Sequence, residues 1–268
     1  MNGLNVLRFF GISLIPFAVA ILLHLFFKFT HPIAFKEKKY NEPKHFKKLY
    51  KKVIYPILNS PHYLTTDPNG MYWFKQVVVG LIFGVIAVAG YFFGVPYKTI
   101  SGDSFLVGNS TVAPVTASFI FGGPAGIISG LFAALFRVAR NDFLRWPTFT
   151  ALIVCSLLDA VVSHFFLKDK RAKFQYGFLG AIFTETFNVL MILIFNIGNI
   201  TDTYHVVGQF GYLCIIFAGL SLALSSIVIS LIEKERLFRT HQEGKKISSR
   251  VQLWLLMLCS LGIAVMAA

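Results

Sequence analysis

Long uninterrupted apolar runs are the feature that most limits what this sequence can fold into. The runs are 16 to 27 residues long, so at about 1.5 Å per residue each can cross, or nearly cross, about 30 Å of hydrocarbon. Only 14% of the 268 residues are charged, against roughly 25% in soluble domains, and 56% are hydrophobic. The sequence therefore predicts an integral membrane protein and excludes a soluble enzyme, a secreted disulfide scaffold and a disordered tail.

One stretch decides how many membrane helices we expect. Residues 106–139 are too many for a single span of about 17 to 25 residues, and Gly122-Gly123-Pro124 interrupts them. The two glycines permit a turn, and proline suits the first turn of a new helix. We therefore split the stretch into two short helices. The predicted helices are residues 4–29, 72–94, 106–121, 124–139, 146–166, 175–197, 206–232 and 251–268.

The distribution of basic residues supports this split, because loops rich in Lys and Arg stay in the cytoplasm. With the hairpin, segments 31–70, 167–174 and 233–250 share one side and carry eight, four and six Lys and Arg residues, whereas the opposite loops carry three. Without the hairpin the two sides carry ten and eleven, which is no bias. The N-terminus is therefore expected outside. The net charge of +13 follows from this topology and does not indicate nucleic-acid binding.

The predicted fold class is all-α: a polytopic membrane helix bundle whose six-helix core contains a short-helix hairpin, with one flanking helix at each end. The lysines of the basic linker are expected to contact anionic lipid headgroups. The last span ends at Ala268 without a polar anchor behind it, and we expect the natural chain to continue. The expected divisions are an N-terminal transmembrane helix (1–30), a basic cytoplasmic linker (31–70), a six-helix domain (71–235), a cytoplasmic connector (236–250) and a further transmembrane helix (251–268).

Ionisable residues within spans are costly and are therefore functional candidates. Arg137 lies near the outer end of its predicted helix, Asp159 lies about 20 Å from the outer end of the next, and Glu185 shares a helix face with Asn188. The functional interpretation is an outward-opening pocket in which Arg137 pairs with an anionic ligand group while Asn188 and Ser156 donate or accept hydrogen bonds. The structural alternative is that these residues join helices, with Arg137 snorkelling or pairing with Asp159.

Other motifs point to packing and not to chemistry. Small residues permit close helix approach, and we assign this role to Gly122, Gly126, Gly130, Gly80 and Gly84. The three cysteines lie inside apolar runs without metal-ligand spacing, and Asp103 and Asp142 are read as isolated loop charges. Phosphate-binding loops, zinc motifs and nucleophile elbows are missing from the sequence, so we expect no enzyme, no cofactor and no metal.

Two runs resemble a known family. The run ASFIFGGPAGIISGLFAALFR, residues 117–137, is similar to the helical hairpin of the Lyt-type (LytS-like) multi-transmembrane receptor domain, in which a Phe-Gly-Pro-x-x-Gly turn leads to a second helix ending in Arg. The run FLGAIFTETFNVLMILIF, residues 178–195, resembles the Glu-x-x-Gln helix of that family, with Glu185 in place and Asn188 where Gln is usual. Asn109 matches an Asn that precedes the family hairpin, but the Arg that often follows it is absent. Cys155 and Ser156 fall close to a Cys and a Ser of the family's next helix.

The resemblance covers about residues 72–235 and implies a membrane-embedded sensor in the bacterial inner membrane. Such a module detects a small molecule, an anionic one included, or a membrane state and relays it to a cytoplasmic output domain, for example a histidine kinase or a diguanylate cyclase. The expected partners are the lipid bilayer, a small-molecule ligand and a second copy of the chain, with no nucleic acid. Two alternatives stay open: the substrate-binding membrane component of an energy-coupling-factor transporter, whose partner would dock on Gly80 and Gly84, and a purely structural assembly protein.

Overall fold

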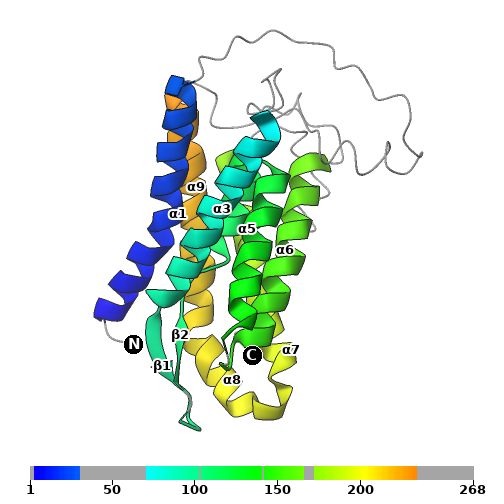
Figure 1. The fold of residues 1–268 in the computed structure, drawn as a ribbon. Coiled ribbons are helices and arrows are strands. Elements are labelled where there is room, and N and C mark those ends of the chain that lie inside the picture. Colours follow the sequence, from blue (N-terminus) through cyan, green and yellow to red (C-terminus); the bar gives the residue numbers. More distant parts are fainter. Residues whose placement is uncertain (1–2, 31–70, 103, 141, 166–171, 234–268) are drawn as a thin grey trace, which may run out of the picture.

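The computed structural model describes residues 3–30, 71–102, 104–140, 142–165 and 172–233 (Figure 1). Predicted segments that fall on other residues, which include most of the basic linker, the connector and the span 251–268, lie outside this described part. The elements are α1 (Gly3–Thr30), α3 (Met71–Phe92), β1 (Val95–Lys98), β2 (Ser104–Val107), α4 (Val112–Phe121), α5 (Gly123–Val138), α6 (Arg145–Phe165), α7 (Phe174–Phe195), α8 (Ile200–Val206) and α9 (Tyr212–Ile232).

The predicted polytopic helix bundle is confirmed. Within the described residues, five helical segments are long and apolar enough to cross a membrane: α1, α3, α6, α7 and the continuous stretch that runs through α8 into α9. A short 3-10 turn (Ile197–Asn199) precedes α8, and a π turn (Val207–Gly211) joins α8 to α9. Large apolar side chains such as Leu22, Phe74 and Leu135 are more than half exposed, as expected for surfaces that face lipid.

The helices form a closed ring around α4. Neighbours in the ring are α1, α9, α7, α6, α5 and α3, and α3 contacts α1 to close it. The central helix α4 contacts all six ring helices, and each of its ten residues is buried. Ten residues span only about 15 Å, or half of the hydrocarbon thickness, so α4 covers half the depth of the bundle. The other half of the centre is left to loops and side chains.

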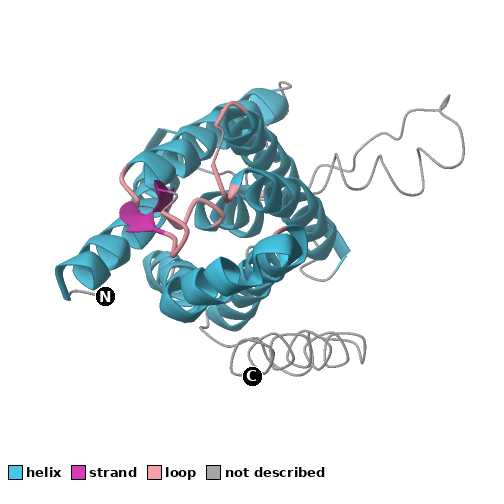
Figure 2. Ribbon diagram, turned by 90° about the horizontal axis from the view of Figure 1, so that it is seen from below, coloured by secondary structure: helices cyan, strands magenta, loops and turns pink. Residues whose placement is uncertain are grey.

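The helix ends alternate between two ends of the bundle (Figure 1). At the linker end, α1 ends, α3 begins and α9 ends. At the β end lie β1, β2 and the loops that join α5 to α6 and α7 to α9. Figure 2 looks onto the β end and shows the strands and loops crossing it. The three segments that the charge count assigns to the cytoplasm all adjoin helix ends at the linker end.

The predicted break at Gly122 is confirmed, and its chemistry explains it. Gly122 has a φ of 128°, a conformation that residues with a side chain rarely adopt, and Pro124 stands in the first turn of α5. The buried Gln76 of α3 holds the turn from both sides, because its Nε2 donates to the Phe121 carbonyl at 2.8 Å and its Oε1 accepts from the Ala125 amide at 2.9 Å.

The predicted start of the first hairpin helix at Leu106 was wrong. Residues Ser104–Val107 form β2, which pairs antiparallel with β1 so that Val95 lies opposite Val107, and α4 begins only at Val112. The apolar run does not separate strand from helix, because Phe105 and Val107 bury one face of a strand here. Asp202 of α8 fastens the hairpin by accepting hydrogen bonds from the amides of Ile100 and Ser101 at 2.7 and 3.2 Å.

The first helix is part of the ring and does not merely flank it. Phe9 and Ala20 of α1 are fully buried, and α1 packs along α9. Ser13 accepts a hydrogen bond from Asn109 at 3.0 Å, and His24 pairs with Glu233 at the end of α9 at 2.9 Å. The polar linker after α1 suggested separation, but the apolar surface of α1 finds its partners in helices that come later in the chain.

Candidate functional site

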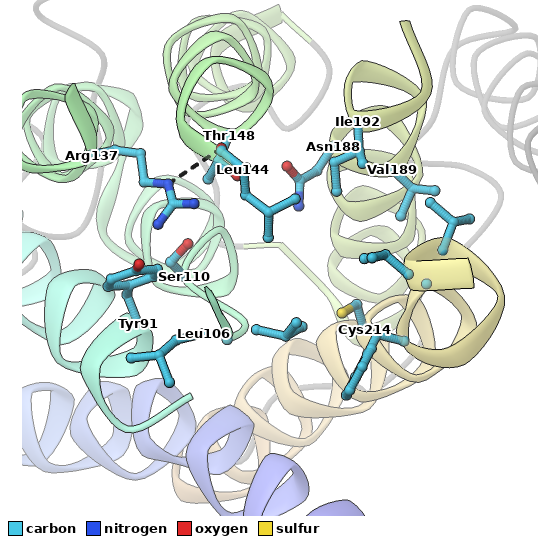
Figure 3. Close-up of a pocket in the computed structure, with 16 residues that line it drawn as sticks. Tyr91, Leu106, Ser110, Arg137, Leu144, Thr148, Asn188, Val189, Ile192 and Cys214 are labelled. Atoms are coloured by element: carbon cyan, nitrogen blue, oxygen red, sulfur yellow. Dashed lines mark hydrogen bonds between the residues drawn. The ribbon is translucent and has the colours of Figure 1, made fainter. Parts of the chain in front are cut away.

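A pocket lies at the β end, below the start of α4 (Figure 3). The space between its walls, including the opening, measures about 530 Å³. Of the three side chains predicted to contact the ligand there, Arg137 of α5 and Asn188 of α7 line it and Ser156 of α6 does not. The remaining lining residues come from α3, the β2–α4 segment, α6, α7 and the α8–α9 stretch: Tyr91, Leu106, Val107, Gly108, Ser110, Leu144, Thr148, Val189, Ile192, Val206, Val207, Phe210, Gly211 and Cys214.

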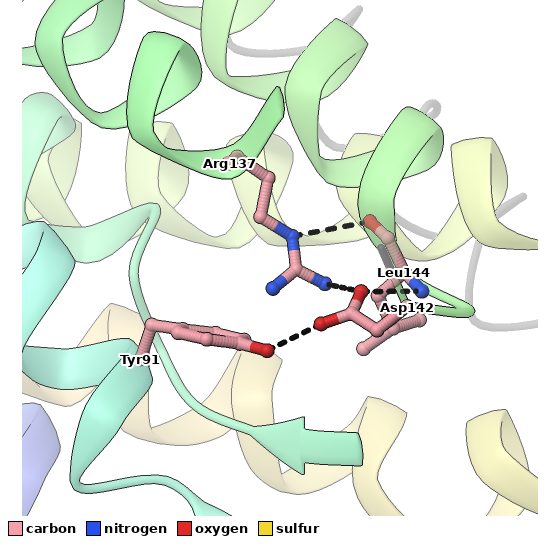
Figure 4. A network of polar contacts seen from close by, with 4 residues as sticks. All are labelled: Tyr91, Arg137, Asp142 and Leu144. Carbon is pink, nitrogen blue, oxygen red and sulfur yellow. Dashed lines mark hydrogen bonds and ion pairs between the residues drawn. The ribbon is translucent and has the colours of Figure 1, made fainter. Parts of the chain in front are cut away.

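Arg137 is held in place from three directions (Figure 4). Its Nη2 donates to a carboxylate oxygen of Asp142 at 2.6 Å, and its Nε donates to the Leu144 carbonyl at 3.4 Å. The guanidinium carbon lies 4.3 Å from the centre of the Tyr91 ring, and the Tyr91 hydroxyl donates to the other oxygen of Asp142. Only 4% of Arg137 is exposed, yet its Nη1 has no hydrogen-bond partner among the described residues. One nitrogen of a fixed, buried cation is therefore free to bind a ligand.

Two expectations about these charges were wrong. Asp142 is not an isolated loop charge, because it pairs with Arg137 and accepts a hydrogen bond from the Leu144 amide at 3.1 Å. Asp159 is not the partner of Arg137. It lies in α6 about 21 Å from the start of that helix, far from the end of α5, and accepts from the Thr184 hydroxyl at 3.3 Å.

The start of α4 adds polar groups to the same pocket. Gly108 and Ser110 line the cavity, and α4 begins two residues after Ser110. The first amides of a helix lack intrahelical partners and carry partial positive charge, and the cap residue Thr111 makes no side-chain capping bond here. Asn109 lies behind this wall, where its Nδ2 donates to Ser13 at 3.0 Å and to the Cys214 carbonyl at 3.4 Å.

Glu185 and Asn188 form the polar wall contributed by α7. Asn188 lines the pocket, and its Nδ2 donates to Glu185 Oε2 at 3.4 Å. Glu185 lies one helical turn deeper and is 1% exposed, and neither its Oε1 nor the Asn188 Oδ1 has a hydrogen-bond partner. Figure 3 shows Arg137 and Asn188 reaching the cavity from different helices.

The other candidates lie away from the pocket. Ser156 and Asp159 are buried, and Ser156, which was expected to contact the ligand, instead donates to the Ile153 carbonyl of its own helix at 3.0 Å. Gly130 packs on Ser156, where an added Cβ would come within 2.5 Å of the Ser156 side chain, and Gly126 packs on Ser118 at the same distance. Gly80 and Gly84 of α3 face Ile128 and Phe132 of α5.

The sequence analysis did not identify several residues of the site. Tyr91 and Thr148 lie near helix ends and carry no signal beyond their polarity. Asp142 had a usable signal, because it follows Arg137 by five residues across a chain reversal and so returns to the same end of the bundle. Among the described residues, no group of three His, Cys, Asp or Glu side chains is placed to hold a metal ion.

Comparison with known families gives one match. The family described as 5TMR of 5TMR-LYT matches residues 64–235, which include the walls of the pocket from α3 to α9 and leave α1 outside. No curated protein and no solved structure matches the chain.

Proposed function

Because the chain belongs to the 5TMR-LYT family of membrane sensory domains, we propose that it is the receptor part of a bacterial signalling protein of the inner membrane. In this proposal a small solute with an anionic group binds in the pocket at the β end. Binding is then relayed along the bundle to a cytoplasmic output domain beyond the linker end. Dimerisation of the chain stays a prediction.

One observation carries the proposal: the unpartnered Nη1 of Arg137. Leaving a charged donor buried without a partner is costly, and natural proteins rarely keep such a group unless it binds something. The guanidinium is fixed by Asp142, Leu144 and Tyr91, so a ligand would lose little affinity to ordering it. Ser110, two residues before α4, brings a further hydroxyl group to the same cavity.

The glycines that favoured the transporter alternative are not available to a partner protein in this fold. A transporter component would present Gly80 and Gly84 to a partner protein, but both are covered by α5, where an added Cβ would meet Ile128 at 2.7 Å or Phe132 at 2.8 Å. The family match favours the receptor for an independent reason.

The anchor is tested by ligand-induced stabilisation of the purified chain in detergent. The probes are acetate, lactate, phosphate and sulfate, each titrated while thermal unfolding is followed. We expect at least one to raise the Tm of the wild-type chain. Arg137→Lys should fold but bind that probe about 10- to 150-fold more weakly, because an ammonium cannot reproduce the fork of donors and a charge-assisted bond contributes about 1.5 to 3 kcal/mol.

The result that would overturn the anchor is an Arg137→Lys chain with wild-type affinity. A wild-type chain that is stabilised by none of the four anions, and by no amino acid that carries a carboxylate, would overturn the whole anion-sensing proposal.

The orientation is tested separately by cysteine labelling in intact cells, in a chain whose native cysteines are replaced. Ile100 lies between β1 and β2 and is 63% exposed, so Ile100→Cys should react with a membrane-impermeant thiol reagent. A cysteine at Lys48 in the basic linker should not. The reverse pattern would place the pocket on the cytoplasmic side and exclude sensing from outside.

The relay is expected to run through α9. Gly211 and Cys214 at one end line the pocket, and Glu233 at the other end follows the last turn of the helix. Inserting one residue after Glu235 would rotate whatever helix follows by about 100°. In a full-length receptor the insertion should change the output. An unchanged output would show that α9 is not the transmitting element.

A further inference from the structure

The pocket has a second polar wall whose charge differs from that of Arg137. On α7, the side-chain Nδ2 of Asn188 donates to Glu185, whereas the side-chain Oδ1 of Asn188 has no hydrogen-bond partner among the described residues. A carbonyl oxygen accepts hydrogen bonds and cannot donate them. This wall therefore suits a donor on the ligand, whereas the Arg137 wall suits an acceptor.

The charges at the site also differ from those of a simple anion site, in which a cation would have no carboxylate partner before the ligand binds. Arg137 already pairs with Asp142, so its positive charge is matched before a ligand arrives. In the described part of the chain, no Lys, Arg or His forms an ion pair with Glu185, although this carboxyl is 1% exposed. A ligand that was only a carboxylate would place a second carboxylate against the guanidinium that already pairs with Asp142. Buried charges are retained in proteins when they are paired.

We propose that the ligand is a small zwitterion of the α-amino carboxylate class, an inference that rests on the sensing function proposed above. The carboxylate of the ligand binds Arg137 Nη1 on the side of Ser110 and the start of α4. The ammonium group of the ligand donates to Asn188 Oδ1, on the side of the Glu185 carboxyl. A protonated amine supplies the donor that Asn188 Oδ1 lacks, and it can donate a second hydrogen bond toward the unpartnered Oε1 of Glu185.

The rest of the pocket limits the side chain of such a ligand. Val189, Ile192, Val206 and Phe210 supply apolar lining from α7 and the α8–α9 stretch. Small apolar amino acids therefore fit better than acidic or basic ones, whose additional charge would face these side chains.

The test compares amino acids with the same molecules lacking the amine, using the full chain in detergent and isothermal titration calorimetry. The matched probes are glycine and acetate, L-alanine and propionate, and L-valine and 3-methylbutanoate. We expect at least one amino acid to bind ten-fold or more tightly than its deaminated counterpart. Glu185→Gln should reduce this ratio of affinities to below about three-fold without weakening the binding of the deaminated counterpart.

Two further variants keep the test decisive. Asn188→Leu removes the acceptor and should weaken binding of the amino acid more than binding of its deaminated counterpart. This variant provides the test if Glu185→Gln fails to fold. Asp159→Asn removes a buried carboxyl that lies outside the pocket and should leave the ratio unchanged.

The outcomes separate the two proposals. If the carboxylates bind as tightly as the amino acids and depend on Arg137, the zwitterion inference is wrong and the anion sensor stands. If an amino acid binds but Glu185→Gln and Asn188→Leu both keep the ratio, α7 does not recognise the amine and the inference is again wrong. If no amino acid, carboxylate, phosphate or sulfate binds, both proposals fail.

Discussion

Two buried polar side chains lie at the two ends of α5 and differ in how they are partnered: Gln76 of α3 contacts the start of α5, and Arg137 stands in its last turn. At the linker end, Gln76 uses its Nε2 and its Oε1 in short hydrogen bonds to the backbone of the Gly122 turn. At the β end, Arg137 uses two of its three nitrogens and leaves Nη1 without a partner. Gln76 contributes to no described pocket wall, whereas Arg137 lines the cavity.

The difference separates a structural polar group from a functional one. A buried group with partners on its donor and acceptor sides stabilises the fold and has nothing left to offer a ligand. A group that is held firmly yet keeps one donor free is arranged for something outside the chain. Burial is no guide here, because Gln76 is 0% and Arg137 only 4% exposed.

The largest effect is expected from Gln76→Leu. The substitution leaves the Phe121 carbonyl and the Ala125 amide buried without partners, each at a cost of about 1 to 3 kcal/mol, so unfolding should become easier by about 2 to 5 kcal/mol. Thermal unfolding in detergent measures this. Gln209→Leu is the control, because Gln209 makes only an exposed 3.4 Å contact with His205. Equal melting of the two variants would remove the structural role of Gln76.

An intermediate effect with a distinctive sign is expected from Asp142→Asn. Loss of the ion pair should cost about 1.5 to 3 kcal/mol of stability, and the unmatched Arg137 should then bind phosphate more tightly than in the wild type. Added phosphate should therefore raise the Tm of this variant more than that of the wild type. Asp202→Asn should lose stability without phosphate rescue, because Asp202 holds the β hairpin. Rescue of both variants by phosphate would point to a general salt effect.

The smallest effect is expected from Tyr91→Phe. The ring under the guanidinium is kept and only the hydroxyl that donates to Asp142 is lost, so stability should fall by about 1 kcal/mol. Tyr204→Phe changes a side chain that is 50% exposed and should have no measurable effect. A loss from Tyr91→Phe as large as that from Asp142→Asn would mean that Tyr91 and Asp142 act as one unit.

The sequence predicted the fold well wherever one physical rule dominated. Hydrophobic length gave the long spans, and the charge bias together with Gly122 and Pro124 gave the hairpin. The rule failed at residues 104–111, where a buried strand and a polar turn continue the apolar run into α4. The Gly108 backbone passes so close to α3 that an added Cβ would lie 2.3 Å from the Gly90 carbonyl oxygen, a contact between distant residues that hydropathy does not reveal.

The sequence identified residues that line the pocket, but it did not identify which residues pair with one another. Arg137 and Asn188 stood out because polar groups inside spans are costly, and both line the pocket. Asp142 was overlooked because a loop charge is inexpensive, and only the chain reversal between α5 and α6 returns it to Arg137. Helix rise alone argued against Asp159 as the partner, since it lies about ten residues deeper in its helix than the pocket wall at Thr148.

The enclosure of α4 sets an order for the biogenesis of this protein. A ten-residue helix with buried Thr116 and Ser118 is too short to cross the bilayer alone, so it gains little from entering lipid when it leaves the ribosome. Its neighbours α6, α7 and α9 are synthesised later, and α9 does not begin until Tyr212. The α4–α5 hairpin therefore stays incompletely covered by other helices until the chain has been synthesised as far as Ile232. A chain that ended before α9 would lack one helix of the ring and the part of the pocket wall that Gly211 and Cys214 supply.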